Sequence, residues 1–218
     1  MENVLAFLNE LSNNNDRDWF QANKKWYDQA KNEFEHLVDN IIKGIREFDP
    51  EIGLLTAKDC TFRIYRDVRF SKNKAPYKTN MGAAISKGGR KSRYASYYLH
   101  IEPGNCFVGG GKWMPPSNEL KSIRYEIFNF TGEFLNIIES DQFKKDFGDI
   151  DGDKLTRPPK EFPVDFEYIE LLKFKSYTAG RSIPEEVVQT GHLLPESLYY
   201  FRQLNPFIVF LNRAMENV

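Results

Sequence analysis

The first 50 residues carry apolar side chains at helical spacing. Val4 to Leu11 reads as a short amphipathic helix, and Asp16 stands where a helix N-cap is favoured. A longer helix is predicted from about Lys24 to Glu47, and Asp49-Pro50 ends it. Its apolar positions recur every three or four residues and form one stripe, made of Tyr27, Ala30, Phe34, Leu37, Ile41 and Ile45.

The middle of the chain changes to a period of two. From Thr61 to Phe70, apolar residues alternate with polar or charged ones, as in a half-buried strand. Further strands are predicted at Met81–Ile85 and Tyr94–Ile101. Cys106–Val108 pairs back on the latter as a hairpin, which the glycine run at 109–111 ends.

Helical spacing returns in the last hundred residues, with an irregular connection at 141–165. The remaining predicted elements are helices at Ser117–Phe130, Glu133–Glu139, Glu167–Lys173, Pro184–Thr190 and Glu196–Ala214, with a kink or break near Pro206, and a strand at Phe174–Arg181. No linker or repeat divides the chain. Residues 1–218 are therefore predicted to form a single α+β domain, a central antiparallel sheet flanked by N-terminal and C-terminal helices.

Composition agrees with a folded, cytoplasmic protein. The chain is 41% hydrophobic and 15% aromatic, which supplies core material and argues against disorder. It holds only two cysteines, which is typical of a reduced compartment. We expect no membrane segment, because no long apolar run occurs at the N-terminus or elsewhere.

Charge is distributed unevenly along the chain. Eleven of the 30 basic residues lie between Lys58 and Arg93, with only two acids among them, so this window carries a formal charge of +9. The rest of the chain carries −10, and the whole carries −1. Charge of one sign gathers where something anionic binds or compensates it. The window therefore predicts an anion site.

The predicted strand at 61–70 concentrates this chemistry. Arg66 falls in the middle of its apolar face, and a buried guanidinium needs a partner. Asp67 is positioned to pair with Arg69 and orient it. Guanidinium forks suit bidentate contacts to phosphate or carboxylate. The candidate ligand-binding residues are Arg63, Arg66, Arg69, Lys74, Tyr77 and Lys78.

Catalytic and metal chemistry have fewer candidates. Asp67 and His100 are the residues that we expect to transfer a proton, if the protein is an enzyme. The three histidines lack zinc spacing, and we expect neither a metal nor a cofactor. The run Gly109–Lys112 is not a P-loop, because Trp113 follows where Ser or Thr is required.

Three functions fit this pattern. The favoured one is an enzyme or binder of a phosphorylated or carboxylate small molecule. Nucleic-acid binding is a second hypothesis, with tyrosines as stacking surfaces, and near-neutral overall charge argues mildly against it. The third is a structural or partner-binding protein whose basic residues pair internally or with another chain.

Three stretches of the chain resemble one known family. They are the runs from Asn13 to Tyr27, from Phe62 to Asn80, and from Gly109 to Trp113 with Arg124 downstream. Together they resemble the domain-of-unknown-function 2461 family of bacterial and fungal proteins. The resemblance implies a compact α+β domain over nearly the whole chain and no particular activity.

The same resemblance bears on two details. Asn73 stands where the family's Ser-Lys-Asp-Lys stretch carries an aspartate, which removes one carboxylate from this chain. The resemblance also implies that Trp19, Asn23 and Tyr27 meet the segment from Arg63 to Asn80 in space.

Overall fold

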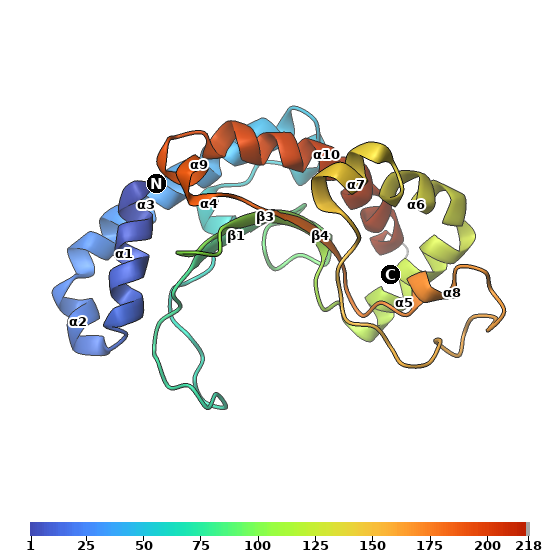
Figure 1. The fold of residues 1–218 in the computed structure, drawn as a ribbon, viewed down its shortest axis with the longest axis horizontal. Coiled ribbons are helices and arrows are strands. Elements are labelled where there is room, and N and C mark those ends of the chain that lie inside the picture. Colours follow the sequence, from blue (N-terminus) through green and yellow to red (C-terminus); the bar gives the residue numbers. More distant parts are fainter. Residues whose placement is uncertain (217–218) are drawn as a thin grey trace.

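Four strands form one antiparallel sheet, and helices lie over one of its faces and beyond its two edges (Figure 1). This computed structural model describes residues 1–216. It confirms the α+β fold, with the sheet flanked by helices from both ends of the chain. In chain order the elements are α1 (Glu2–Asn13), α2 (Arg17–Ala22), α3 (Lys24–Arg46), the 3-10 turn η1 (Pro50–Ile52), α4 (Ala57–Cys60), β1 (Met81–Ile85), β2 (Ser96–Ile101), β3 (Phe107–Lys112), α5 (Ser117–Asn129), α6 (Thr131–Ile138), α7 (Asp141–Phe147), α8 (Ile169–Leu172), β4 (Tyr177–Ser182), α9 (Glu185–Gln189) and α10 (Leu193–Met215).

The N-terminal helices form where the spacing predicts them. Asp16 caps α2 by accepting a hydrogen bond from the backbone N–H of Trp19 at 2.9 Å. The predicted stripe of α3 is buried, except that Leu37 is only partly covered. This stripe packs against α1 and α10, so the long helix becomes part of the core (Figure 1).

The sheet separates a covered face from an open one. Strands are ordered β1-β2-β3-β4, and side chains alternate between the faces. Tyr97, Leu99 and Ile101 of β2 are fully buried, on the face over which α10 and α3 arch. Helix α10 is continuous through Pro206, where a kink or break was predicted. Tyr98 and His100 lie on the opposite face.

The predicted strand at 61–70 is wrong. Thr61 forms an isolated bridge with Ala83 of β1, and residues 62–80 form a finger that projects below the sheet (Figure 1). The two sides of the finger pair through the isolated bridge of Tyr65 with Tyr77. The alternation of apolar and polar residues predicted a strand with one buried face, but two of its apolar side chains are not buried. Phe62 is 43% exposed and Phe70 is 96% exposed. Arg66 therefore does not sit in an apolar strand face.

The glycine run at 109–111 was predicted to end the hairpin, but it lies inside β3. A Cβ on Gly109 would stand 2.7 Å from the carbonyl oxygen of Ala179 in β4, and one on Gly111 would meet Tyr177. Gly111 also has a φ of +124°, which other residues rarely adopt. The glycines thus permit close pairing of β3 with β4 rather than a turn.

The stretch 141–165, predicted to be irregular, begins with α7. Ser140 caps this helix by accepting a hydrogen bond from the backbone N–H of Phe143. The chain then runs without a helix or strand to α8 and enters the sheet as β4. This late strand pairs with β3 and places residues 147–151 beside the open face of the sheet.

Candidate functional site

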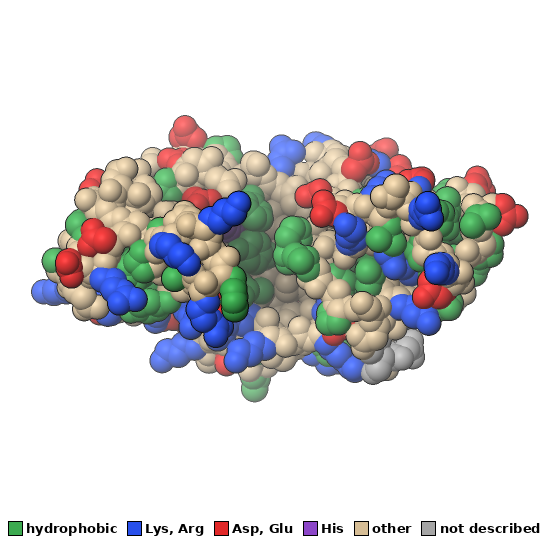
Figure 2. Space-filling view, turned by 90° about the horizontal axis from the view of Figure 1, so that it is seen from below, with side chains coloured by type: hydrophobic (Ala, Val, Ile, Leu, Met, Phe, Trp, Pro, Cys, Tyr) green, Lys and Arg blue, Asp and Glu red, His purple; other side chains and the backbone are tan. Residues whose placement is uncertain are grey.

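A cleft of about 830 Å³ lies on the open face of the sheet. Among residues 1–216, no helix crosses this face (Figure 1). Figure 2 looks into the face from below and shows a hollow between two lobes. A cleft of this volume accommodates a small organic ligand.

Strand register explains why Tyr98 and His100 project from a floor that is otherwise formed largely by small residues. One row across the sheet runs from Ala84 through Tyr98 to Gly109 and Gly180. The small residues leave Tyr98 standing alone in this row. His100 occupies the neighbouring row and stacks on the ring of Phe107, with centroids 4.6 Å apart. A ligand in the cleft would therefore lie against bare backbone beside Tyr98.

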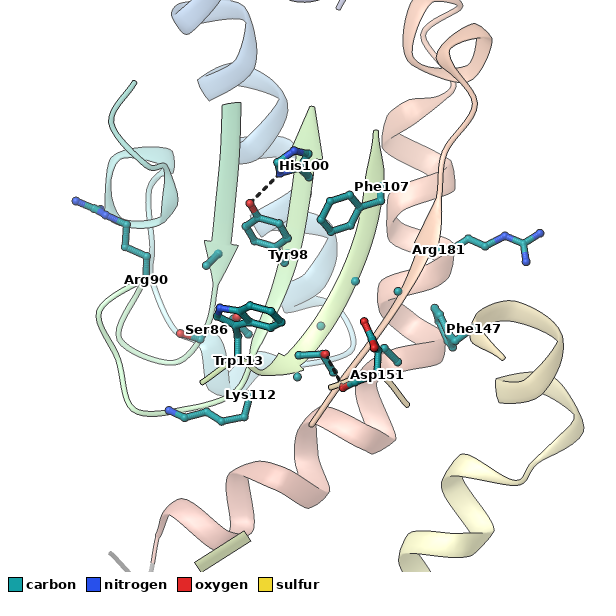
Figure 3. A pocket seen from close by; sticks show the side chains of 18 of the residues that line it. Ser86, Arg90, Tyr98, His100, Phe107, Lys112, Trp113, Phe147, Asp151 and Arg181 are labelled. Carbon is teal, nitrogen blue, oxygen red and sulfur yellow. Dashed lines mark hydrogen bonds between the residues drawn. The ribbon is translucent and has the colours of Figure 1, made fainter. Parts of the chain in front are cut away.

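The two walls differ in chemistry. The finger side contributes Phe62 and Lys78, and Tyr94 follows nearby. The far side contributes Phe147 and Asp151 (Figure 3). In Figure 3, the guanidinium ends of the lining residues Arg90 and Arg181 point away from the cavity. Positive charge inside the cleft therefore comes chiefly from the finger wall.

Lys78 is the cation that the finger presents to the cleft. Its Nζ lies 5.4 Å from the centre of the Phe62 ring, and no acid among residues 1–216 forms a salt bridge with it. Burial lowers the pKa of Lys78, and the nearby charge of Arg63 lowers it further. The ammonium is thus partly removed from water without a counter-charge.

A chain of hydrogen bonds runs from Tyr98 and His100, which line the cleft, to Glu102. The Tyr98 hydroxyl lies 3.0 Å from His100 Nδ1, and His100 Nε2 lies 3.2 Å from Glu102 Oε2 (Figure 3 draws the first of these contacts). Thr79 and Asn105 also donate to the Glu102 carboxylate, at 2.8 and 3.1 Å. Burial opposes ionisation of Glu102, but the donors outweigh it, so the pKa of Glu102 is lowered.

Four of the predicted site residues lie in the finger, away from the cleft lining. Arg66 donates to the Ala75 carbonyl at 2.9 Å and to Ser71 Oγ at 3.3 Å, and so braces the finger. Asp67 and Arg69 pair at 2.7 Å near the finger tip, as predicted. Lys74 donates to the Val68 carbonyl at 3.0 Å. Of these contacts, the Asp67–Arg69 pair is the acid pairing that the structural hypothesis expects, whereas Arg66 and Lys74 donate to carbonyl or hydroxyl oxygens.

The other predicted residues are divided between core and cavities. Tyr77 is buried, and its ring stacks on Phe20 at 4.0 Å, so it faces the core. Arg63 lines a smaller cavity of about 290 Å³ on the other side of Phe62, together with Tyr27. Lys78 and His100 alone among the predicted residues line the large cleft.

The N-terminal motif does meet the finger, mainly through residues other than the three implied. Asn15 exchanges two hydrogen bonds with the backbone of Tyr77, at 3.0 and 3.1 Å. Phe20 stacks on the Tyr77 ring, and Tyr27 lines the smaller cavity beside the finger. The base of the finger is thereby anchored to the region of helices α1 to α3 (residues 2–46), the helical lobe.

Sequence reasoning missed Tyr98 and Glu102 as site residues. The available signal was the period-two pattern Tyr98-x-His100-x-Glu102, which places three polar side chains on one face of a strand. Trp113, 69% exposed at the rim of the cleft, was also missed. Nothing in its local sequence separates it from a core tryptophan.

The part of the chain that the structure describes offers neither a metal-binding cluster nor a helix suited to cross a membrane. Residues 1–216 hold no cluster of three or more His, Cys, Asp or Glu side chains arranged to bind a metal ion. None of the helices in this range is both long enough and apolar enough to span a bilayer.

Comparison with known proteins identifies the family. The family model described as "Conserved hypothetical protein (DUF2461)" matches residues 3–210. Neither the curated proteins nor the solved structures gave a significant match. Because the family model covers nearly the whole chain, including the helical lobe, the finger and the sheet, the protein belongs to the DUF2461 family of conserved hypothetical proteins.

Proposed function

We propose that the protein binds a small organic anion, phosphorylated or carboxylated, in the cleft on the open face of the sheet. The observation that carries this proposal is Lys78, a partly desolvated ammonium that lines the cleft and has no acidic partner among residues 1–216. An unpaired charge that is taken out of water is costly, and it persists where a ligand compensates it.

The surroundings of Lys78 favour an anion over a neutral ligand. Arg63, which lines the smaller cavity, adds positive charge near Lys78 and lowers the pKa of Lys78. Lys112, also in the lining, is already neutralised by Glu119 at 2.7 Å. Asp151 lies on the far wall, so the cleft has a positive and a negative side. A ligand would therefore place its anionic group beside the finger.

A refined assignment follows for the predicted site. Lys78 contacts the anion, and Arg63 strengthens the field around it. Arg66 holds the shape of the finger, while Arg69 and Lys74 remain at its tip, where they could contact only a ligand larger than the cleft.

For chemistry on a bound ligand, we favour His100 over Asp67. His100 lines the cleft and is connected to Tyr98 and Glu102. Asp67 is exposed and paired with Arg69, whose hydrogen bonds lower the pKa of Asp67. A carboxylate held in that way is a poor proton acceptor.

The test is a thermal-shift screen at low salt with inorganic phosphate, pyrophosphate, sugar phosphates and small di- and tricarboxylates. A ligand at one hundred times its dissociation constant stabilises a protein by about 2.7 kcal/mol, which corresponds to a few degrees. Lys78→Met is compared with Lys72→Met, which removes the same charge from an exposed site on the finger outside both cavities. We expect at least one compound to shift wild type and Lys72→Met but not Lys78→Met. Identical responses of the two variants would refute the proposal.

Nucleic-acid binding remains the second candidate, because aromatic side chains stand exposed beside the cations. Phe62 lies under Lys78 at the cleft wall, and Trp113 stands at the rim. Bases stack on such rings, and phosphates attract such cations. This function predicts binding of a fluorescent oligonucleotide whose affinity falls steeply as salt rises, with a slope of about 0.7 per neutralised phosphate for a single strand. Binding that is absent at low salt eliminates it.

A further inference from the structure

The hydroxyl of Tyr98 occupies space that is open because the neighbouring strand has a glycine, Gly82, at this position. It lies over Gly82 of the neighbouring strand, where an added Cβ would stand only 2.7 Å from the hydroxyl oxygen. The Tyr98 ring packs between those of Phe62 and Phe107, whose centroids lie 6.4 and 5.6 Å from its own. The phenol is thus fixed at the floor of the cleft beside His100.

The hydrogen-bond chain has a defined direction. Glu102, held ionised by its donors, accepts a hydrogen bond, so His100 donates to it from Nε2. A neutral imidazole then carries a lone pair on Nδ1, and the Tyr98 hydroxyl donates to that atom. Glu102 therefore fixes the tautomer of His100, and His100 fixes the direction of the Tyr98 proton.

The Tyr98 phenol and the Lys78 ammonium lie against the same ring, that of Phe62. Lys78 lies over the Phe62 ring, and Phe62 contacts Tyr98 edge-on. A small anion held by Lys78 would therefore extend toward the Tyr98 hydroxyl. Burial raises the pKa of Tyr98 to about 12, so the group is a neutral phenol at pH 7 and passes a proton on rather than storing a charge.

We propose that Tyr98 is a catalytic residue that removes a proton from a hydroxyl group of the bound anion, with His100 as the final proton acceptor and Glu102 as the positioning residue. In this step the ligand O–H bond breaks and its proton moves to Tyr98 Oη. The original Tyr98 proton moves to His100 Nδ1. The ligand gains one negative charge, His100 becomes an imidazolium, and Glu102 balances that imidazolium. The substrate class is a hydroxylated organic anion. Its anionic group rests on the proposed function of Lys78, whereas the proton relay does not.

A hydrogen-bond chain with a purely structural role would show the same contacts among Tyr98, His100 and Glu102, so the test must measure reactivity. Aryl sulfonyl fluorides report it directly, because the Tyr98 oxygen attacks sulfur, the S–F bond breaks, fluoride leaves and the phenol proton moves to His100 Nδ1. Two probes are used: 4-(fluorosulfonyl)benzoate, which is an anion, and tosyl fluoride, which is neutral. Peptide mass spectrometry gives the labelling rate of Tyr98 and of the exposed Tyr125 in the same sample.

The relay predicts that wild-type Tyr98 is labelled about tenfold or more faster than Tyr125 by either probe. His100→Phe keeps an aromatic ring against Phe107 and removes the acceptor, so Tyr98 labelling falls to the Tyr125 rate or below. Glu102→Gln removes the counter-charge and slows Tyr98 by about tenfold. Labelling of Tyr98 that is no faster than that of Tyr125, or that is unchanged in His100→Phe, would overturn the proposal.

Two further measurements keep the test independent of folding defects and of the anion site. The ¹⁵N chemical shifts of His100 in the wild-type protein report its tautomer, and a proton on Nδ1 rather than Nε2 contradicts the relay without any variant. Lys78→Met is expected to lower the ratio of anionic to neutral labelling of Tyr98, whereas Lys72→Met leaves both rates unchanged. Dependence on His100 with no effect of Lys78 on the ratio refutes the anion anchor and retains the relay. If the ratio depends on Lys78 but the labelling rate of Tyr98 does not depend on His100, the relay is refuted and the anion anchor is retained.

Discussion

Gly82→Ala displaces the Tyr98 hydroxyl without removing it. The Cβ would lie 2.7 Å from the hydroxyl oxygen and 3.3 Å from the carbon that bears it, whereas ordinary contact begins near 3.4 Å. The oxygen is therefore about 0.7 Å too close. Because Phe62 and Phe107 confine the ring, we expect the hydroxyl to move away from His100 as it retreats.

The size of the effect follows from the two contacts that change. Overpacking of this kind costs about 1 to 3 kcal/mol of unfolding free energy. Loss of the Tyr98–His100 hydrogen bond accounts for about 1 kcal/mol of it, which is roughly a fivefold change in an equilibrium or rate. Gly82→Ala should therefore destabilise the protein by about 1 to 3 kcal/mol and slow Tyr98 labelling by about fivefold or more.

Urea unfolding followed by tryptophan fluorescence measures the first quantity, in a double-mutant cycle with Tyr98→Phe. Without the hydroxyl, the added methyl meets no atom closer than 3.3 Å, so Gly82→Ala should cost at least 1 kcal/mol less in that background. Gly132→Ala is the control, because its Cβ would meet nothing within 4 Å in helix α6, and it should stabilise by about 0.5 to 1 kcal/mol. Equal costs of Gly82→Ala in both backgrounds would show that the methyl–hydroxyl contact is not the cause.

Three further predictions test charge and burial elsewhere. Lys112→Met leaves the Glu119 carboxylate buried without its cation, and should lower the unfolding free energy by about 3 to 5 kcal/mol in urea at pH 7; a loss below 1 kcal/mol contradicts this. The pKa of Glu102 is lowered in the folded state, so its contribution to stability is complete above the unfolded pKa of about 4.3 and is lost as the pH falls through the folded pKa. Unfolding free energy measured against pH should consequently fall less steeply in acid for Glu102→Gln than for wild type. Burial raises the pKa of Cys60 to about 12 and also raises that of Cys106, so a disulfide reagent at pH 8 should label both thiols only in urea.

Local patterns were sufficient where one element buries one face. The stripe of α3 specifies a side that must leave water, and the structure places that side in the core. In β2, alternation separates Tyr97, Leu99 and Ile101 from the side chains of the other face, but only packing decided which face is buried. The Asp16 cap and the Asp67–Arg69 pair were also predictable, because both depend on residues two or three positions apart. The family resemblance was confirmed over nearly the whole chain.

The finger shows where local pattern fails. Alternation at 61–70 looks like a strand, but a strand needs a partner along its length, and here the chain turns back on itself instead. Arg66 finds its acceptors on Ala75 and Ser71, which its position in the pattern does not reveal. The glycine run was misjudged for the related reason that the carbonyls it must accommodate belong to β4, about 70 residues later in the chain.

Most of the helices, the strands of the hairpin and the concentration of positive charge could be predicted from the sequence, because each depends on the spacing of neighbouring residues. Which cations line a cavity depends instead on packing between distant segments. Lys78 and His100 come from different segments and meet at the cleft because β1 and β2 pair in one register, while Tyr77 turns into the core through its contact with Phe20. Long-range packing sets these directions, since the same residue types satisfy a salt bridge, a loop carbonyl or a ligand equally well until their neighbours are placed.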